Sequence, residues 1–269
     1  MKRSAALAAA LTVALAATPV FAQAPPGLRL YVFSSGSLGG FTKAALQIAG
    51  HAGIDAAPVF YVIKHPRGNV LFDTGGGDTT MADAAGWWGP LATGFGLRTT
   101  TNETVAVHLA RIGLTLSDIK FVVVGHARSA RLGTFPNATF VVQNDEATPA
   151  AGAERGASMY YVPGDVADAG YNVVRLDGNL DLFNDRSIEI IRTSGPTPGS
   201  QFALVRLPKQ GTVVLTDKNL LPRGMWSPMA MYEGYQRIRH FRDTEGASIF
   251  YARDPETFKA TRQAPDYYE

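Results

Sequence analysis

Two series of short β-type runs, each accompanied by helical segments, constrain the fold of this chain more than any other feature. The runs are rich in Val, Ile, Phe and Tyr, and short polar or glycine-containing turns separate them. In the first half they are 28–33, 59–63, 69–72, 120–124 and 139–143. In the second half they are 171–176, 187–192, 201–207, 212–216 and 248–252. Two strand-rich halves predict two β-sheets packed face to face, with helices on their outer faces.

Helix signals occur between and after these runs. The expected helices are 103–112, 144–151, 228–241 and a last one that begins at Pro255, where proline is tolerated. Thr101 or Asn102 is the expected N-cap of the first helix, and its apolar residues Val105, Leu109 and Ile112 fall on one face. That face predicts a helix packed on a sheet.

The chain length of 269 residues suits one large domain or two small ones, and such a chain buries a sizeable apolar core. The chain contains no cysteine. That absence excludes disulfide bonds, thiol nucleophiles and cysteine-rich zinc sites. No internal repeat and no long low-complexity linker divides the sequence. We therefore expect one domain over residues 23–269.

Residues 1–22 have the pattern of a cleaved signal peptide. Lys2 and Arg3 precede an apolar run at 5–17 that is too short to span a membrane comfortably, and Ala22 ends a small-residue cleavage site. We expect cleavage after Ala22 and a periplasmic or secreted protein, with an uncleaved anchor as the alternative. No second apolar run of membrane length follows, so no membrane attachment is expected after cleavage.

The charge of the expected mature chain argues against a nucleic-acid partner. The full chain has 25 Lys and Arg against 23 Asp and Glu, and Lys2 and Arg3 belong to the leader. The mature chain then has 25 − 2 = 23 basic and 23 acidic residues, which is formally neutral. A neutral chain lacks the basic excess that is typical of nucleic-acid binding.

Several separated stretches carry the pattern of a known family. They are 61–75, 114–124 followed by His126, 135–139, 142–143, 177–193, 197–199, 213–216 and 254–255. In this order they resemble the N-acyl-homoserine-lactonase-like branch of the metallo-β-lactamase-fold superfamily, over nearly the whole expected mature chain. The resemblance implies a four-layer αββα sandwich, and a hydrolase that uses two metal ions, usually zinc.

The first metal motif of the family is His-x-His-x-Asp-His. Its imidazole and carboxylate groups bind the metals from one loop, and a bridging water is deprotonated between them. The corresponding stretch here is His126-Ala127-Arg128-Ser129-Ala130-Arg131. Only His126 keeps its residue type, because Arg128, Ala130 and Arg131 replace the other ligands.

The later metal positions depart in the same way. The resemblance places Pro196 at the next histidine and Arg253 at the last. An ungapped match puts Lys218 at the bridging aspartate, whereas a one-residue deletion puts Asp217 there, and the sequence leaves both open. Arginine and proline side chains supply no metal ligand, and a catalytic zinc needs about three protein ligands. The sequence therefore predicts no dinuclear site and no metal cofactor.

The other histidines show no spacing typical of metal ligands. They are His51, His65, His108 and His240. We expect His65 at a strand end and His108 on a helix surface. They therefore offer no second metal site.

The replacements predict a cationic site. Its residues are His126, Arg128, Arg131, Lys218 and Arg253. Unpaired buried charges are costly, so such a cluster requires neutralisation. One interpretation is an internal salt-bridge cluster with Asp73, Asp217 and Asp254. Another is a pocket for a small anionic or lactone-like ligand, because arginine binds carboxylates in a bidentate manner.

Two further interpretations stay open. His126 activates Ser129 or Ser200 for metal-free catalysis in one of them, although neither serine lies in a Gly-x-Ser-x-Gly elbow. In the other, the protein is an interaction scaffold without a small ligand. The sequence favours a catalytically degenerate relative of the lactonases that binds a ligand, and its alternative is an active lactone or ester hydrolase.

Overall fold

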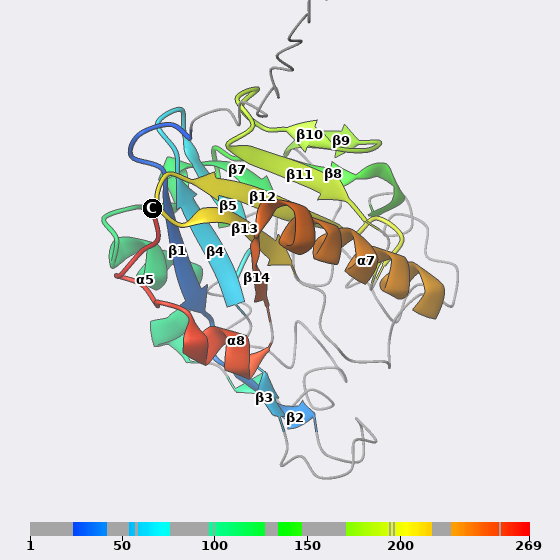
Figure 1. Ribbon diagram of the computed structural model, residues 1–269. Helices are drawn as coiled ribbons and strands as arrows, with labels where there is room; N and C mark the ends of the chain where they lie inside the picture. The colour runs from blue at the N-terminus through cyan, green and yellow to red at the C-terminus, as the bar shows by residue number, and fades with distance from the viewer. Residues whose placement is uncertain are drawn as a thin grey trace, which may run out of the picture.

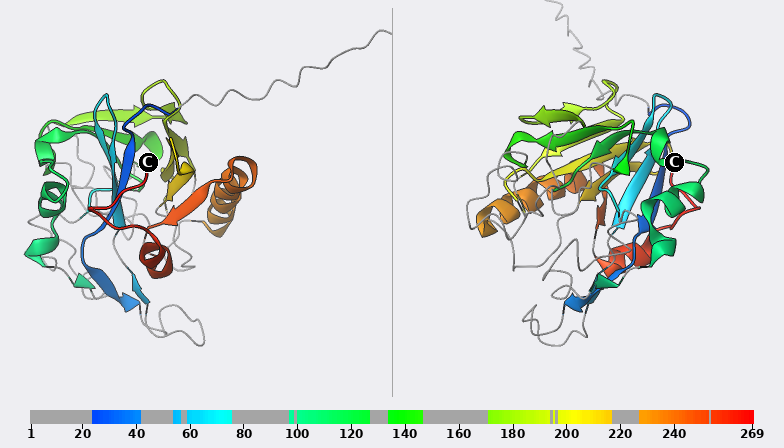
Figure 2. Two further views of the ribbon diagram at one scale, coloured as in Figure 1. Left: turned by 60° about the vertical axis from the view of Figure 1, so that its left-hand side comes forward. Right: turned by 180° about the vertical axis from the view of Figure 1, so that it is seen from behind.

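The computed structural model describes residues 24–41, 54–56, 59–75, 97–98, 100–126, 134–146, 171–193, 195, 197–216, 227–252 and 254–269. Two β-sheets lie face to face in the centre of the molecule (Figure 1). Helix α5 (Val105–Ala110) lies on one outer side and α7 (Pro228–Glu245) on the other, as the left view of Figure 2 shows. The predicted four-layer αββα sandwich is confirmed.

The first sheet combines two kinds of strand pairing. Its order is β1 (Arg29–Ser34), β4 (Val59–Lys64), β5 (Asn69–Phe72), β7 (Ile119–Val123), β8 (Thr139–Gln143) and β9 (Asn172–Leu176). β1, β4 and β5 pair in antiparallel fashion, whereas β5, β7, β8 and β9 run parallel. The carboxyl ends of the four parallel strands therefore meet at one edge of the sheet.

One end of the second sheet lies beside this edge of the first sheet. Its order is β10 (Leu180–Asp181), β11 (Ile188–Arg192), β12 (Gln201–Leu207), β13 (Gly211–Thr216) and β14 (Ser248–Tyr251). β10 to β13 are antiparallel, and β13 and β14 are parallel. The Gln201 N–H donates to the Gly125 carbonyl at 2.9 Å, so β12 begins where β7 ends.

The sandwich has two opposite ends at which loops connect the strands, the carboxyl edge and the hairpin edge. The carboxyl edge comprises the residues at the ends of β5, β7, β8, β11 and β13 and at the start of β12. The hairpin edge lies at the opposite end and comprises the turn 65–68 between β4 and β5 and the loop 183–187 before β11.

Alternation along the strands fills all the layers. In β4, Tyr61 and Ile63 belong to the cluster between the two sheets, whereas Phe60 and Val62 belong to the cluster beneath α5. In β12, Phe202 belongs to a third cluster, which contacts Ile238 of α7. Successive side chains of a strand point to opposite faces, so each sheet buries both of its faces.

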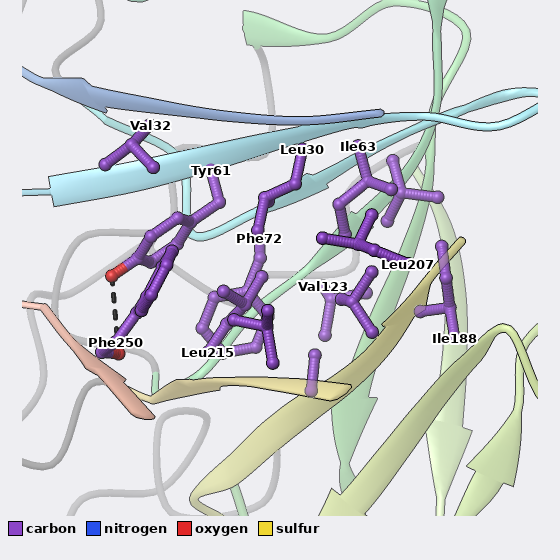
Figure 3. Packing of buried hydrophobic residues seen from close by; sticks show 14 of the residues in the cluster. Leu30, Val32, Tyr61, Ile63, Phe72, Val123, Ile188, Leu207, Leu215 and Phe250 are labelled. Atoms are coloured by element: carbon purple, nitrogen blue, oxygen red, sulfur yellow. Dashed lines mark hydrogen bonds between the residues drawn. The ribbon is translucent and has the colours of Figure 1, made fainter. Parts of the chain in front are cut away.

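Figure 3 shows the cluster between the sheets. Leu30, Phe72 and Val123 of the first sheet lie against Leu215 and other residues of the second. The Tyr61 hydroxyl crosses the interface and donates to the Phe250 carbonyl at 3.3 Å, the dashed line of Figure 3. This hydrogen bond therefore joins a strand of the first sheet to a strand of the second inside the core.

The helices begin and end where capping groups stand. Residues Thr101–Glu103 form a separate 3-10 turn, η1, and the N-cap of α5 is Thr104, so the predicted caps Thr101 and Asn102 were wrong. The Thr104 hydroxyl accepts the Val107 N–H at 3.4 Å. α7 ends at Glu245 and not at the predicted residue 241, because its C-cap is Gly246, whose backbone is left-handed.

Several short elements were not predicted. A small sheet comprises β3 (Ile54–Ala56), β2 (Ser37–Phe41) and β6 (Leu97–Arg98), in that order, and η2 (Leu116–Asp118) precedes β7. The last helix, α8 (Pro255–Ala260), begins after Asp254 as expected. Within the described residues, no helix has both the length and the apolar character that crossing a membrane requires.

Candidate functional site

Asp73 and Gly125 lie side by side at the carboxyl edge. β5 and β7 are parallel neighbours, and the Asp73 N–H continues their pairing by donating to the Val123 carbonyl at 2.9 Å. The Asp73 carboxylate accepts the Gly125 N–H at 2.9 Å. Asp73 has a φ of 60°, a left-handed conformation that is rare for residues other than glycine. Strain of this kind persists only where the surroundings fix it.

His126 follows Gly125 and is the described member of the predicted cationic site. It is 5% exposed at the carboxyl edge. Arg128, Arg131, Lys218 and Arg253 lie outside the described residues, so their convergence stays a prediction. The Ala252 N–H donates to the Thr216 carbonyl at 2.8 Å, which aligns the residues that come just before Asp217 and Arg253 in the sequence.

A second polar group of the carboxyl edge is Glu146, which is completely buried. Its two carboxylate oxygens lie 2.9 and 2.7 Å from the Thr197 hydroxyl, and one of them accepts the Gly199 N–H at 3.1 Å. A Cβ added to Gly199 would lie 2.3 Å from the Glu146 backbone nitrogen. The carboxylate therefore anchors the 197–200 loop, and only glycine allows the close approach.

Ser200 belongs to the same loop and does not have the arrangement of a nucleophile. Its hydroxyl donates to the Thr197 carbonyl at 3.0 Å and accepts the Thr197 N–H at 3.1 Å. A nucleophilic serine needs a base that takes its proton. The hydrogen bonds of Ser200 instead close the turn of its own loop. Ser129, the other candidate nucleophile, lies outside the described residues.

The proposed neutralising carboxylates have structural partners. Asp73 holds Gly125, and Asp254 caps α8 by accepting the Thr257 N–H at 3.0 Å. Asp217 lies outside the described residues. The internal salt-bridge interpretation thus lacks support from Asp254, whose carboxylate is engaged by the helix terminus.

Two phenols shape the electrostatics on the side of β14 and α7. Burial raises the pKa of Tyr235 in α7 to about 12, and the nearby phenol of Tyr251 adds to this shift. Burial also raises the pKa of Tyr251, which ends β14. Both phenols therefore keep their protons at neutral pH.

Of the two histidines with a predicted place away from this edge, one lies where it was expected and one does not. His65 follows β4, as predicted for a strand end. His108 is not on a helix surface: it is 4% exposed and contacts the rings of Phe33 and Phe60. Burial, together with the nearby Arg111, lowers the pKa of His108. The prediction for His108 was wrong because this residue lies three positions after Val105 and next to Leu109, on the same buried face of the helix.

Sequence reasoning missed three residues of the carboxyl edge. They are Gln143, Glu146 and Gln201, all buried. The available signal was their position, since Gln143 ends one predicted strand and Gln201 begins another. A polar residue at the end of a buried strand requires a partner, and that requirement points to a network.

A metal centre requires several ligating side chains that converge on one point. In the part of the chain that the structure describes, no three His, Cys, Asp or Glu side chains are grouped so that they could hold a metal ion. The segments 127–133 and 217–226, which follow His126 and Thr216 in the sequence, are outside that part. The described residues alone therefore do not define a metal site.

Comparisons with known proteins agree on one group. No protein-family model matches the chain. The N-acyl homoserine lactonase AttM of Azorhizobium caulinodans is 27% identical over 260 residues, which cover 90% of this chain and 99% of AttM. The fold resembles that of an N-acyl homoserine lactone hydrolase crystallised with its product N-hexanoyl-L-homoserine at the catalytic metal centre. The TM-score is 0.74 at 20% identity, over 89% of this chain and 98% of that one.

The sandwich therefore has the metallo-β-lactamase fold of these structural relatives. The curated proteins that the chain resembles, at 22 to 27% identity, are named N-acyl homoserine lactonase. The resemblance inferred from the sequence is thereby confirmed.

The prediction of no metal cofactor is contradicted by the same comparisons. Another structural relative is AidC, a dizinc quorum-quenching lactonase, with a TM-score of 0.61 at 17% identity over 90% of this chain and 94% of AidC. The relatives are thus metal-dependent enzymes. The prediction equated the loss of familiar ligand types with the loss of metal, but a metal centre draws its ligands from several loops.

Proposed function

We propose that this protein is an exported relative of the lactonases that binds a small lactone or its ring-opened carboxylate at the carboxyl edge and opens the ring slowly. The observation that carries the proposal is the stretch His126-Ala127-Arg128-Ser129-Ala130-Arg131. It retains one imidazole and adds two guanidinium groups where the family motif has imidazoles and a carboxylate. The proposal concerns ligand and turnover, and any metal in the site is a matter for measurement.

The chemistry of arginine supports a carboxylate ligand. A guanidinium stays charged and presents a planar set of donors that matches a carboxylate. Arg128 and Arg131 are two and five residues beyond the buried His126 in the sequence. The structural relative crystallised with N-hexanoyl-L-homoserine holds such an open-ring carboxylate at its active site. We infer that the arginines here favour the acid over the neutral ring.

The same replacements argue for slow hydrolysis. Ring opening in the family depends on a water that is deprotonated by metal held in a set of imidazole and carboxylate ligands. At Arg128, Ala130 and Arg131 this chain has groups that accept neither a proton nor a metal. Any metal that the site binds must be held by another ligand set, so water activation differs from that of the relatives.

A second candidate function is an active lactone or ester hydrolase with a rearranged site. The observation that favours it is the similarity to proteins named N-acyl homoserine lactonase over 90% of this chain. Asp73 at the carboxyl edge and the histidine His126 are groups that such a site uses. Lactone turnover distinguishes this function from the first.

Export rests on the leader pattern. Lys2, Arg3, the apolar run 5–17 and Ala22 support cleavage after residue 22 and a periplasmic or secreted location. Expression of the full chain in a bacterium, followed by fractionation and N-terminal sequencing, tests it. We expect Gln23 as the first residue of the exported protein, and a full-length cytoplasmic product would refute export.

The decisive experiment measures binding and turnover on one sample. Thermal shift and calorimetry are done with N-hexanoyl-L-homoserine and with its lactone, and ring opening and metal content are measured alongside. We expect the acid to raise the melting temperature, because a ligand that binds only the native state stabilises it. We also expect Arg131→Gln to weaken acid binding by about tenfold.

The exposed Arg242 supplies the matched control. It lies near the end of α7 and pairs with Asp243 at 2.8 Å. Arg242→Gln removes the same charge from the protein and is expected to leave acid binding unchanged. Rapid ring opening with stoichiometric metal establishes the hydrolase instead, and absence of binding by either probe rejects the proposal.

A further inference from the structure

Gly125, the residue before His126, is held by both sheets at once. Its N–H donates to the Asp73 carboxylate of the first sheet at 2.9 Å, and its carbonyl accepts the Gln201 N–H of the second sheet at 2.9 Å. Both hydrogen-bonding groups of this peptide backbone are thereby used. The direction in which the chain enters His126 therefore depends on partners from two different sheets.

The side chain of Gln201 extends this attachment. Its Nε2 donates to the Val124 carbonyl at 2.8 Å and to the Val141 carbonyl at 2.9 Å. Two acceptors on the nitrogen side fix the orientation of the amide, since the oxygen cannot face a carbonyl. Gln201 thus bonds residues 124 and 125 consecutively, and ties them to the neighbouring strand β8.

Gln143 completes the arrangement. Its Nε2 donates to the Gln201 Oε1 at 2.9 Å and to the Gly178 carbonyl at 2.8 Å, and its Oε1 accepts the Gly178 N–H at 3.2 Å. Gln143 is 1% exposed and Gln201 2%. Because both side chains are buried, removal of the Gln201 amide takes the side-chain donor away from the Val124 carbonyl and water does not replace it, while the Val141 carbonyl keeps the Val124 N–H at 3.2 Å.

We propose that the side chain of Gln201 is the positioning group of the candidate site: by holding the Val124 carbonyl beside β8, next to the backbone bond between residues 201 and 125, it fixes the place of His126. Gln143 keeps the Gln201 amide in the required orientation. The consequence for ligand binding rests on the proposed function, whereas the effect on His126 does not.

The test compares Gln201→Met with the unchanged full chain. Methionine has a similar length and removes every hydrogen bond of the side-chain amide, whereas the backbone N–H of residue 201 keeps its bond to the Gly125 carbonyl. The ring resonances of His126 are followed by NMR, assigned by their loss in His126→Gln, and the affinity for N-hexanoyl-L-homoserine is measured by calorimetry. We expect the His126 resonances to shift and broaden, and the affinity to fall by about tenfold.

Tyr61→Phe is the matched control. It also removes one buried hydrogen bond between the sheets, from Tyr61 to Phe250, but this bond does not involve residues 124–126. We expect it to lower the melting temperature without moving the His126 resonances or the affinity. Equal changes in both variants would show that general loosening, rather than Gln201, sets the place of His126.

Two outcomes remain distinct. If Gln201→Met does not fold, Gln143→Met is used, which leaves the Gln201 donors but removes the amide that orients them. We expect a smaller shift of the His126 resonances, and unchanged resonances overturn the proposal. If the unaltered protein binds neither the acid nor the lactone, the proposed function fails, and the NMR comparison still decides the role of Gln201.

Discussion

At the carboxyl edge, the side chains of Gln143, Glu146 and Gln201 are buried, and each forms hydrogen bonds with a neighbouring strand or loop. At the hairpin edge, ring stacking and partly exposed ion pairs hold the polar groups. There, the His65 ring lies flat on Phe183 with 3.8 Å between centroids. Its Nε2 lies 3.4 Å from Asp185, which also pairs with Arg67. The two ends of one sandwich thus use different means of fixing a loop.

The difference between the edges determines where water can replace a lost hydrogen-bond partner and where it cannot. The side chains of Asp185 and Arg67 are 29% and 51% exposed, so water replaces a lost partner at the hairpin edge. At the carboxyl edge the amides and the carboxylate are sealed, and a lost partner leaves a buried group unsatisfied. Changes at the carboxyl edge should therefore cost more.

Gly199→Ala should produce the largest effect. The new Cβ meets backbone atoms of Glu146, and the loop must move. We expect the free energy of unfolding to fall by about 3 kcal/mol, measured by urea denaturation. At the same end of the sandwich as the hairpin edge, Gly211 begins β13 after the turn from β12, with a φ of 79° and open space around its Cβ position. Gly211→Ala should cost about 1 kcal/mol, and equal losses would break the comparison.

Thr197→Val comes next. The Thr197 hydroxyl bonds to Glu146 and Ser200 in the buried cluster, so its removal should lower the free energy of unfolding by about 2 kcal/mol. Ser187→Ala removes a bond of 2.6 Å to the partly exposed Asp185 and should cost about 1 kcal/mol. A larger loss for Ser187→Ala would show that solvent does not compensate at the hairpin edge.

The hairpin edge should make the stability depend on pH. Burial lowers the pKa of His65 below its ordinary value of about 6.5, although Asp185 opposes the shift. The native protein therefore binds fewer protons here than the unfolded chain. The contribution is present above about pH 6.5 and is lost as the pH falls through the native pKa, by up to about 1.4 kcal/mol per pH unit.

His65→Gln should therefore flatten the fall in stability between pH 7 and pH 5, as followed by urea denaturation at each pH. The variant is less stable overall because it loses the stacking on Phe183, so the slope is the quantity to compare. His240→Gln, at an exposed position of α7, should keep the slope of the unaltered protein. If the slope of stability against pH is unchanged in His65→Gln, another group causes the acid sensitivity. The buried His108, whose pKa is also lowered, is then the next residue to test.

Asp177→Asn should have the smallest effect and marks the limit of the carboxyl edge. Asp177 pairs with Arg192 at 2.6 Å, but its side chain is 76% exposed. Arg192 also pairs with Asp145. We expect a change in the free energy of unfolding of about 0.5 kcal/mol or less. A loss comparable to that of Thr197→Val would extend the rigid region out to this surface pair.

The fold was predictable because its strands are buried on one or both faces. Runs such as 69–72, 139–143 and 201–207 coincide with the observed strands, since dense β-branched and aromatic residues leave few alternatives. The small sheet of β2, β3 and β6 was missed, because Ser37–Phe41 contains two glycines and lacks that signal. The α5 cap was missed because Thr101, Asn102 and Thr104 each offer a capping group within four residues.

The candidate site was predictable only in part. The family pattern identified His126 and Asp73, and the structure places Asp73 beside the glycine that precedes His126. The amide pair of Gln143 and Gln201 joins residues 58 positions apart. Neither residue has a local pattern that announces its partner, because a long-range hydrogen bond depends on the register of two sheets. Such partners emerge only from the fold.

The left-handed backbone of Asp73 links the evolution of two positions. A side chain at residue 125 would collide with the Asp73 carboxylate, since a Cβ there would lie 2.9 Å from its Oδ1. The carboxylate in turn helps to hold Asp73 in a conformation that costs a non-glycine residue about 1–2 kcal/mol. A substitution at one of these positions therefore affects the other. A larger residue at 125 requires the Asp73 carboxylate to leave the position in which it accepts the N–H of residue 125, so we expect substitutions at the two positions to be coupled.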